Sequence, residues 1–339
     1  MRRRTPQESY PRHQPYSRQR NSNNTFHQRP SDSGIPAATV WLPILSRHLG
    51  IKTKQQQEIF LVACVASILA IWFFTPISDY IATWILWTVP VDSDVDLGRA
   101  ALVSLEQQYP PVIDRWGVQR IGFELVKASS HSTNQNINAA FENIRQYKWD
   151  FGVVHAPKIV NAFALPGGIV RVTDTLLRTL SLTDAELAAL ISHEMGHVLH
   201  RHTQKRAVKT RLLSTIWEAF VYEDHDGYEE SFGEAVAEGL WNSASYLGGL
   251  AFSRADEYQA DDAAWELLSS TYQSTYHGHD RTRKYSPKSV RRLLQKLWDY
   301  QGGSGETSWE STHPGTRDRM DALDKKWNKL MWAQKRMFN

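Results

Sequence analysis

Hydrophobic side chains recur at helical spacing along residues 184–202. The apolar positions lie three or four residues apart, as is typical of a helix with one buried face: Leu187, Leu190, Ile191, Met195 and Val198. Thr183 precedes this pattern and Glu186 follows it at the third position, so the two can form the capping box that begins a helix. We therefore predict a largely buried helix in the middle of the chain.

The rest of the chain carries a mixture of helical and extended patterns. Helical periodicity is present at residues 97–109, 137–147, 254–268, 287–300 and 314–332. Extended patterns predict strands at residues 118–126 and 149–155, and two more within 160–172, on either side of Pro166-Gly167-Gly168. Residues 207–250 hold helical stretches interrupted by an acidic loop, and residues 302–311 form a further loop. These elements predict a mainly helical α+β fold with a small sheet beside the helix at 184–202.

One apolar stretch has no polar face. Residues 59–74 carry no charged side chain, and the uncharged run continues to Ile77, close to the roughly 20 residues that a helix needs to cross a bilayer. We predict one transmembrane helix here. Residues 81–91 contain Trp84 and Trp87 but are too short for a second crossing, so we expect them to lie in the membrane interface or to extend the first helix. The chain thus divides into residues 1–57, 58–91 and 97–330.

Basic charge is concentrated ahead of this apolar stretch. Residues 1–57 contain ten of the 39 Lys and Arg residues and two of the 36 acids. Such a polar, Arg-rich segment is expected to be a disordered arm. The positive-inside tendency places the arm in the cytoplasm or the matrix and the domain after residue 90 on the opposite side; if residues 81–91 also cross, the domain returns to the cytoplasm. Because the basic charge is confined to the arm, we expect no nucleic-acid partner.

The predicted helix at residues 184–202 also carries candidate chemistry. Its centre reads His193-Glu194-Met-Gly-His197, and four residues are just over one helical turn, so the two imidazoles project from one face. Two nitrogen ligands, an open position for water and a carboxylate that takes the proton of that water are what a zinc hydrolase requires. Cys64 is the only cysteine of the sequence, so a metal must be held by His and carboxylate groups.

A third protein ligand has to come from another helix. Glu257 and Asp261 are four residues apart and therefore share a helix face, so the first could bind the ion while the second accepts a hydrogen bond from a ligand imidazole. Asp256 and Asp262 share the segment, and spacing alone leaves them open as ligands. We expect His200 and His202, which follow the motif on the same predicted helix, to be surface residues or to support the ligands.

Four motifs follow one another in the chain: Asn161-Ala-Phe-Ala-Leu-Pro-Gly-Gly168, Glu186 to His197, Glu257-Tyr-Gln-Ala-Asp261, and Ser311-Thr-His-Pro314 with Arg319. In this order they resemble the membrane-associated gluzincin metallopeptidases of the HtpX and mitochondrial OMA type, over roughly residues 97–330. The resemblance implies a zincin-like metallopeptidase domain that binds one Zn²⁺ through His193, His197 and Glu257, with Glu194 as general base. It also implies that His313 approaches the reacting carbonyl.

The same resemblance implies a substrate cleft bordered by an edge strand that can pair with an extended peptide. The candidate substrate-binding residues are Asn161, Ala162, Phe163, Pro166, Gly167, Gly168 and, as a second candidate donor to the oxyanion, Arg319. We expect a membrane-anchored zinc endopeptidase that acts on polypeptides, in particular membrane or misfolded proteins in quality control, with the lipid bilayer as a further partner. The alternative is a non-catalytic, membrane-anchored peptide-binding or chaperone-like module. Such a module would not need Glu194 or a full ligand set, and this sequence has both.

Overall fold

The computed structural model describes residues 77–130, 143–221, 252–276, 285–300 and 309–330, with isolated positions between 53 and 67. The chain divides into two units, residues 1–67 and 68–339, and the elements below belong to the second. Most of the predicted basic arm, most of the predicted transmembrane run and the acidic loop lie outside the described residues. Among the helices that are described, none is long and apolar enough to cross a membrane.

Four short strands form a mixed sheet in the order β1-β2-β4-β3. The strands are β1 (Pro111–Val112), β2 (Asp150–Val154), β3 (Ala162–Leu165) and β4 (Ile169–Thr173). β2 runs parallel to β4, whereas β1 and β3 are antiparallel to their neighbours. β3 is therefore an edge strand of this sheet, and the strand predicted at residues 149–155 is confirmed.

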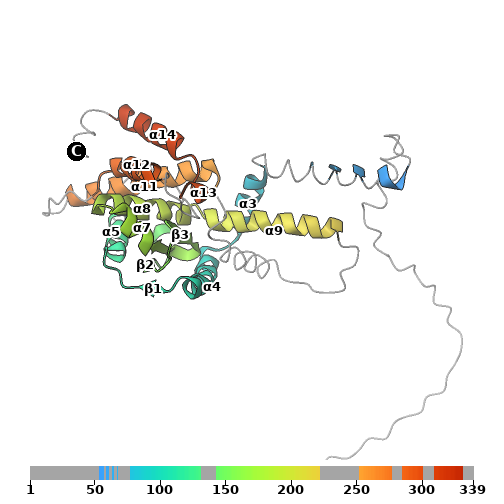
Figure 1. Ribbon diagram of the computed structural model, residues 1–339, viewed down its shortest axis with the longest axis horizontal. Helices are drawn as coiled ribbons and strands as arrows, with labels where there is room; N and C mark the ends of the chain where they lie inside the picture. Colours follow the sequence, from blue (N-terminus) through green and yellow to red (C-terminus); the bar gives the residue numbers. More distant parts are fainter. Residues whose placement is uncertain are drawn as a thin grey trace, which may run out of the picture. The chain divides into compact units, whose positions relative to one another are not determined.

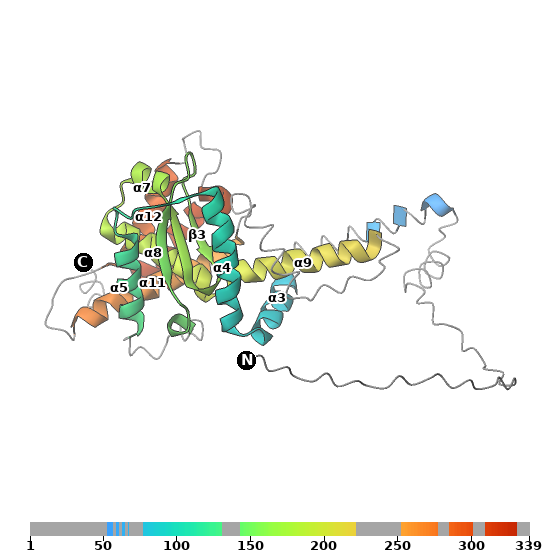
Figure 2. The ribbon, with the colours of Figure 1, turned by 90° about the horizontal axis from the view of Figure 1, so that it is seen from below.

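The turn between β3 and β4 is the one that the sequence predicted. Pro166–Gly168 forms a short 3₁₀ turn, η2, in which Gly167 has φ 74° and Gly168 has φ 100°. Residues other than glycine rarely adopt such positive φ values. A Cβ on Gly167 would also lie 2.6 Å from Cα of Val95, because helix α4 (Val91–Gln108) packs directly on the turn. In Figure 2, α4 runs alongside the sheet next to β3.

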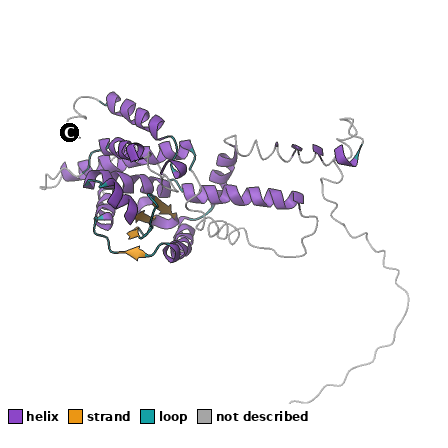
Figure 3. Cartoon of the chain, viewed as in Figure 1, coloured by secondary structure: helices purple, strands orange, loops and turns teal. Residues whose placement is uncertain are grey.

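Helices make up most of the described structure (Figure 3). Besides α4 they are α3 (Ile77–Thr88), α5 (Val118–Ser130), α7 (Asp174–Leu180), α8 (Asp184–Leu199), α9 (His202–Val221), α11 (Arg254–Tyr276), α12 (Lys288–Tyr300), α13 (Trp309–Thr312) and α14 (Thr316–Lys329). The described fold is therefore mainly helical α+β, as predicted. Figure 1 shows α8 between the sheet on one side and α11 and α12 on the other.

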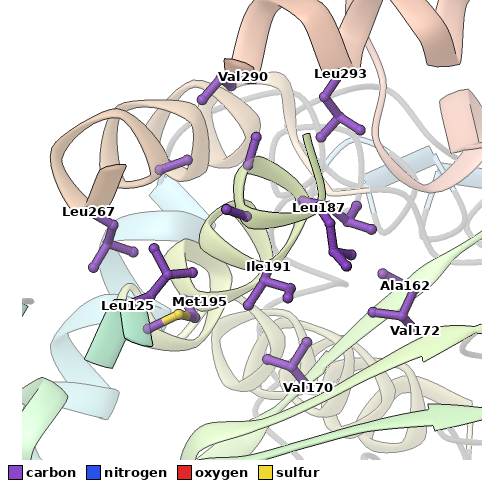
Figure 4. Close-up of a cluster of buried hydrophobic side chains, with 14 of the residues drawn as sticks. Leu125, Ala162, Val170, Val172, Leu187, Ile191, Met195, Leu267, Val290 and Leu293 are labelled. Atoms are coloured by element: carbon purple, nitrogen blue, oxygen red, sulfur yellow. The ribbon is translucent and has the colours of Figure 1, made fainter. Parts of the chain in front are cut away.

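The core forms around α8, which is buried along nearly its whole length. In Figure 4, Leu187 and Ile191 lie between side chains of β3 and β4 and side chains of α12, and Met195 lies near Leu125 and Leu267. Such all-round burial explains why the apolar pattern of this segment extends beyond one face. It also fixes the position of any group that α8 carries.

Helices α8 and α11 approach closely at Gly196. A Cβ on this residue would lie 2.9 Å from Cα of Ala260 and 3.0 Å from Cβ of Ala263. Close approach of two backbones at a glycine lets the side chains on either side of it reach one another. The polar face of α8 therefore meets the polar face of α11 across a short distance.

The strand predicted at residues 118–126 is wrong, because this segment is helix α5. Its buried residues Val118, Ile121 and Leu125 are three and four positions apart, which is helical spacing. The carboxylate of Asp114 accepts hydrogen bonds from the backbone nitrogens of Trp116, Gly117 and Gln119 and so supplies the helix start. An alternation of apolar and polar residues suggested a strand, but the cap and the burial pattern determine a helix.

Three other boundaries differ from the prediction. α8 ends at Leu199, so His202 begins a separate helix, α9, and is not on the helix of the metal motif. α11 extends to Tyr276, beyond the predicted residue 268. Part of the loop predicted at 302–311 is the short helix α13, whose Trp309 is buried in the core.

The capping box at the start of α8 is confirmed and gives a testable pH dependence. Thr183 N donates to Glu186 Oε2 over 2.9 Å, Glu186 N donates to Thr183 Oγ1 over 3.3 Å, and Lys296 Nζ lies 2.7 Å from the same carboxylate. Burial raises the pKa of Glu186, but the hydrogen bonds from Lys296 and Thr183 outweigh it and lower the pKa overall. The ionised form of Glu186 therefore stabilises the fold.

We expect Glu186→Gln to lower the free energy of unfolding by about 1 kcal/mol at neutral pH, because a charge-assisted contact is lost. The folded pKa lies below the unfolded value of about 4.3, so the contribution is present above that pH and is lost as the pH falls through the folded value. Urea unfolding of both proteins at several pH values measures the difference. Asp299→Asn, at an exposed position of α12, is the control, and a difference that persists at low pH contradicts the assignment.

Candidate metal centre

The polar face of α8 and the start of α11 together form a buried cluster of metal-binding groups. Nε2 of His193 and Nε2 of His197 are 3.1 Å apart, and each lies 3.4 Å from an oxygen of Glu257. The three side chains are almost completely buried. With metal–ligand bonds of about 2.0–2.1 Å, the corners of a tetrahedral zinc site are about 3.3 Å apart. The donor atoms are thus spaced as zinc requires, and the cluster can hold one metal ion.

His313 belongs to the same cluster. One ligand atom each from His193, His197, Glu257 and His313 lie within 4.8 Å of one another. His313 follows α13 and its ring stacks on the ring of Trp309 at 3.8 Å between centroids. Its Nε2 is 3.6 Å from Oε1 of Glu194 and is buried without a hydrogen-bond partner among the described residues. The chain therefore places this imidazole close to the ion position, where it could bind either the ion or a group attached to it.

Glu194 is placed beside the three ligand residues. It follows His193 on α8, is fully buried, and neither of its oxygens has a hydrogen-bond partner among the described residues. Burial raises the pKa of Glu194 to about 7. A carboxylate with such a pKa can both accept and release a proton near neutral pH, which is what a general base that later acts as an acid needs.

Asp261 and Arg319 contact the ligand residues of the cluster. Oδ1 of Asp261 lies 3.0 Å from Nδ1 of His193. Arg319, on α14, donates through Nε and Nη2 to the two oxygens of Asp261, over 2.7 Å each, and also forms an ion pair with Glu257. Arg319, which was a candidate for substrate binding, is itself buried and makes these contacts with the carboxylates of α11.

The charges of the cluster follow from these contacts. Burial raises the pKa of Glu257, but the guanidinium of Arg319 outweighs it and holds the pKa well below its usual range. Burial lowers the pKa of His197 to about 4. Burial also lowers the pKa of His193, yet the nearby carboxylates of Asp261 and Glu257, at 3.0 and 3.4 Å, raise it to about 9, and a ring that binds a metal has to give up this proton.

The two other carboxylates that spacing left open point elsewhere. Asp256 is bonded to Lys205 and to the backbone nitrogen and hydroxyl of Ser253 at the start of α11. Asp262 is exposed and lies 2.7 Å from Nζ of Lys326. Neither belongs to the cluster, which leaves Glu257 as the carboxylate from α11 in it.

The segment expected to border a substrate cleft lies next to the cluster but is buried. Asn161 to Leu165 form or precede β3, and the carbonyl of Ala164 accepts a hydrogen bond from Thr203 over 2.9 Å. Oδ1 of Asn161 lies 3.4 Å from Oγ1 of Thr312, beside His313. Pro166 and Gly167 pack against α4, and Gly168 packs against Tyr147 and Trp149. Peptide binding by these residues stays a prediction.

Three residues near the cluster were not predicted as part of the site. Phe252 stacks on His197 at 3.9 Å between ring centroids, and Trp309 stacks on His313. Gln259 contacts His202, whose other ring nitrogen contacts His197. An isolated aromatic or amide residue carries no spacing signal that relates it to a metal motif, so only the fold brings these residues together.

The fold and the cluster together define the class of the metallopeptidases, and comparisons with known proteins agree. The model of "Peptidase family M48" matches residues 126–327. Metalloprotease LoiP of Escherichia coli is 31% identical over 192 residues, which cover 55% of this chain and 68% of that protein. Mitochondrial metalloendopeptidase OMA1 of Arabidopsis thaliana is 31% identical over 198 residues, 57% of this chain and 35% of that protein.

A second mitochondrial metalloendopeptidase OMA1, from Schizosaccharomyces pombe, is 28% identical over 187 residues, 55% of this chain and 48% of that protein. The chain therefore spans less than half of the length of these two mitochondrial relatives. Because the family model covers more than half of the chain, and LoiP is matched over two thirds of its length, the chain belongs to peptidase family M48.

Proposed function

We propose that this chain is a membrane-anchored, zinc-dependent endopeptidase that hydrolyses peptide bonds in polypeptide substrates. The observation that carries the proposal is the spacing of the donor atoms of His193, His197 and Glu257, at 3.1 to 3.4 Å, with Glu194 beside them. Two neutral nitrogens and one carboxylate that leave a position open are the ligand set of a catalytic zinc site. A purely structural zinc site would be closed by a fourth protein ligand, for which His313 is in reach, but such a site would have no use for Glu194.

His193, His197 and Glu257 would hold the zinc, which supplies Lewis acidity and lowers the pKa of a bound water towards about 7. Glu194, which lies beside the ligand residues, would accept the proton of the attacking water and deliver it to the leaving amine. Asp261 keeps the ring of His193 turned so that Nε2 faces the ion. His313 is the candidate group for contact with the oxygen on which negative charge develops.

The substrate would be an extended polypeptide. β3 is an edge strand beside the cluster, and strand addition would pair the substrate with this edge after the carbonyl of Ala164 has given up its hydrogen bond from Thr203. In the described structure the cluster is closed off by aromatic rings, since Phe252 covers His197 and Trp309 covers His313. A substrate therefore has to displace side chains from this space before its backbone reaches the ion.

The membrane location is part of the same proposal. On α3, five large apolar side chains are between 37% and 84% exposed: Ile77, Tyr80, Ile81, Trp84 and Trp87. Tryptophan and tyrosine are the residues that prefer the membrane–water interface. The helix also follows directly after the uncharged stretch at residues 59–76 of the sequence. With the basic arm ahead of that stretch, we propose a single membrane crossing, the domain on the side opposite the arm, and membrane or misfolded proteins as substrates.

Protease protection of sealed vesicles that carry the full chain tests the location. Protection of the domain together with digestion of the arm from outside, or the reverse, is expected for one crossing. Digestion of both parts from the same side would place the domain and the arm together, as a second crossing at residues 81–91 requires.

Proteolysis itself is tested with the purified full-length chain in detergent micelles and an unfolded protein such as casein as substrate. We expect cleavage at internal peptide bonds, its loss on removal of the metal with 1,10-phenanthroline, and its recovery on addition of one equivalent of zinc. Zinc binding without any cleavage would favour the alternative, a peptide-binding module that has kept the cluster.

A further inference from the structure

The two histidines of the cluster have different partners on their outer ring nitrogens. Nδ1 of His193 faces the carboxylate of Asp261 at 3.0 Å. Nδ1 of His197 instead lies 2.9 Å from Nδ1 of His202, the first residue of α9. His202 is 1% exposed, so water does not take part in this contact. The contact joins a metal-binding imidazole to a second buried imidazole that does not reach the ion position.

The direction of this hydrogen bond follows from the far side of His202. Its Nε2 lies 2.9 Å from Oε1 of Gln259 and 3.5 Å from Oδ1 of Asp256. Both oxygens accept hydrogen bonds, so Nε2 of His202 has to carry a hydrogen. In a neutral imidazole the other nitrogen, Nδ1, is then an acceptor. Nδ1 of His197 must therefore be the donor, and the lone pair of His197 is left on Nε2, the atom that faces Glu257 and His193.

The backbone between α8 and α9 is shaped to make this contact. Five residues along a continuous helix would place His202 about 140° around the axis from His197, facing away from it. The helix ends at Leu199 instead, and the backbone of Arg201 has φ 54°, a left-handed conformation that residues other than glycine rarely adopt. Arg201 is held there by hydrogen bonds to the carbonyls of Leu86 and Val89 and by Asp94. The break in the helix returns the ring of His202 to His197.

We infer that His202 is a positioning residue for the metal ligand His197. Through its hydrogen bond to Gln259 it fixes the tautomer and the ring orientation in which His197 presents Nε2 to the ion. It thereby does for His197 what Asp261 does for His193, with a neutral acceptor in place of a charged one. The inference rests on the proposed function in one respect, which is that the ion bound by His197 is zinc.

Two substitutions at this position separate a hydrogen-bond role from a packing role. His202→Leu fills a similar volume but removes the acceptor, whereas His202→Asn keeps an oxygen close to where Nδ1 stood. Loss of a group that orients a metal ligand typically lowers metal affinity by about 10–100-fold. We expect that range for His202→Leu and recovery of most of the affinity in His202→Asn. His155 pairs with Asp174 and contacts neither His202 nor a ligand residue in the described structure, so His155→Leu is the control and is expected to bind zinc as the wild type does.

The measurement is the dissociation constant for zinc, obtained with the full-length chain in detergent by competition against a chromophoric chelator. Thermal unfolding of the metal-free proteins is recorded alongside. Equal zinc affinity in wild type and His202→Leu overturns the inference. The inference is also overturned if His202→Leu and His202→Asn lose zinc affinity equally and the Tm of both metal-free variants falls by a similar amount. That result would show that His202 acts only through packing. Gln259→Met, at an exposed position, provides a variant that keeps the fold if the Leu variant does not; it is expected to weaken zinc binding, and unchanged affinity there also overturns the inference.

The outcomes distinguish this inference from the function on which it rests. A wild-type chain that binds no zinc overturns both. A wild-type chain that binds zinc tightly and cleaves protein, with His202→Leu indistinguishable from it in affinity, overturns the role of His202 alone.

Discussion

Replacing Glu194 by glutamine is expected to abolish peptide-bond hydrolysis while zinc content and fold are retained. The carboxylate of Glu194 is fully buried, has no hydrogen-bond partner among the described residues, and lies beside the ligand residues on α8. Glutamine has nearly the same shape, so packing is preserved, but an amide cannot take the proton of the attacking water. General-base catalysis contributes about 10²–10⁴-fold to rate, so the loss of kcat should be at least of this order.

The comparison requires three measurements on wild type and Glu194→Gln: casein cleavage, zinc per chain, and thermal unfolding. Unchanged zinc and unchanged Tm with lost cleavage is the expected combination. Full cleavage by the metal-replete variant would contradict the role of Glu194. Asp184→Asn, an exposed change on the same helix, controls for effects of the substitution on α8 as a whole.

Replacing Glu257 by alanine is expected to remove zinc from the protein. Glu257 supplies the carboxylate oxygens that lie 3.4 Å from Nε2 of His193 and of His197, and it is the acid of α11 that belongs to the group of candidate ligands in the described structure. Two histidines without a carboxylate leave the ion with an incomplete ligand set. Zinc per chain should therefore fall from one to close to zero after dialysis, and cleavage should fall with it.

Asp262→Ala is the matched control for this prediction. Asp262 lies on the same helix five residues further on, is exposed, and pairs with Lys326. It should retain one zinc per chain. Full zinc content in Glu257→Ala, measured by atomic emission after dialysis, would move the third ligand to another residue. An equal loss of zinc in both variants would indicate damage to α11 and not the loss of a ligand.

The elements that the sequence predicted well are those whose signals are local. The capping box of Thr183 and Glu186 begins α8, and the glycines after Pro166 mark the turn between β3 and β4, because in each case neighbouring residues determine the backbone. The segment 118–126 was predicted as a strand because its apolar and polar residues were read as alternating. The cap from Asp114 lies ahead of the segment, and burial of Val118, Ile121 and Leu125 against the core selects the helical spacing of the apolar residues over the alternation.

The residues of the site also divide into those that local sequence signals predict and those that only the fold brings together. Spacing placed His193 and His197 on one helix face, and Glu257 and Asp261 on another, because helical geometry is local. His202 was placed on the helix of the motif, since periodicity gave no sign of the break at Arg201. The reason for that break lies in α3 and α4, whose carbonyls and Asp94 hold Arg201. Arg319 likewise becomes the partner of Asp261 and Glu257 only when α14 packs on α11.

The measurement that tests the central claim most directly is X-ray absorption at the zinc edge of purified Glu194→Gln protein, combined with zinc stoichiometry. The account predicts one zinc per chain, nitrogen and oxygen ligands at about 2.0–2.1 Å, and outer-shell scattering from imidazole rings. Absence of bound zinc, or a sulfur shell at about 2.3 Å, which among the residues of this sequence would have to come from Cys64 or methionine, would contradict it.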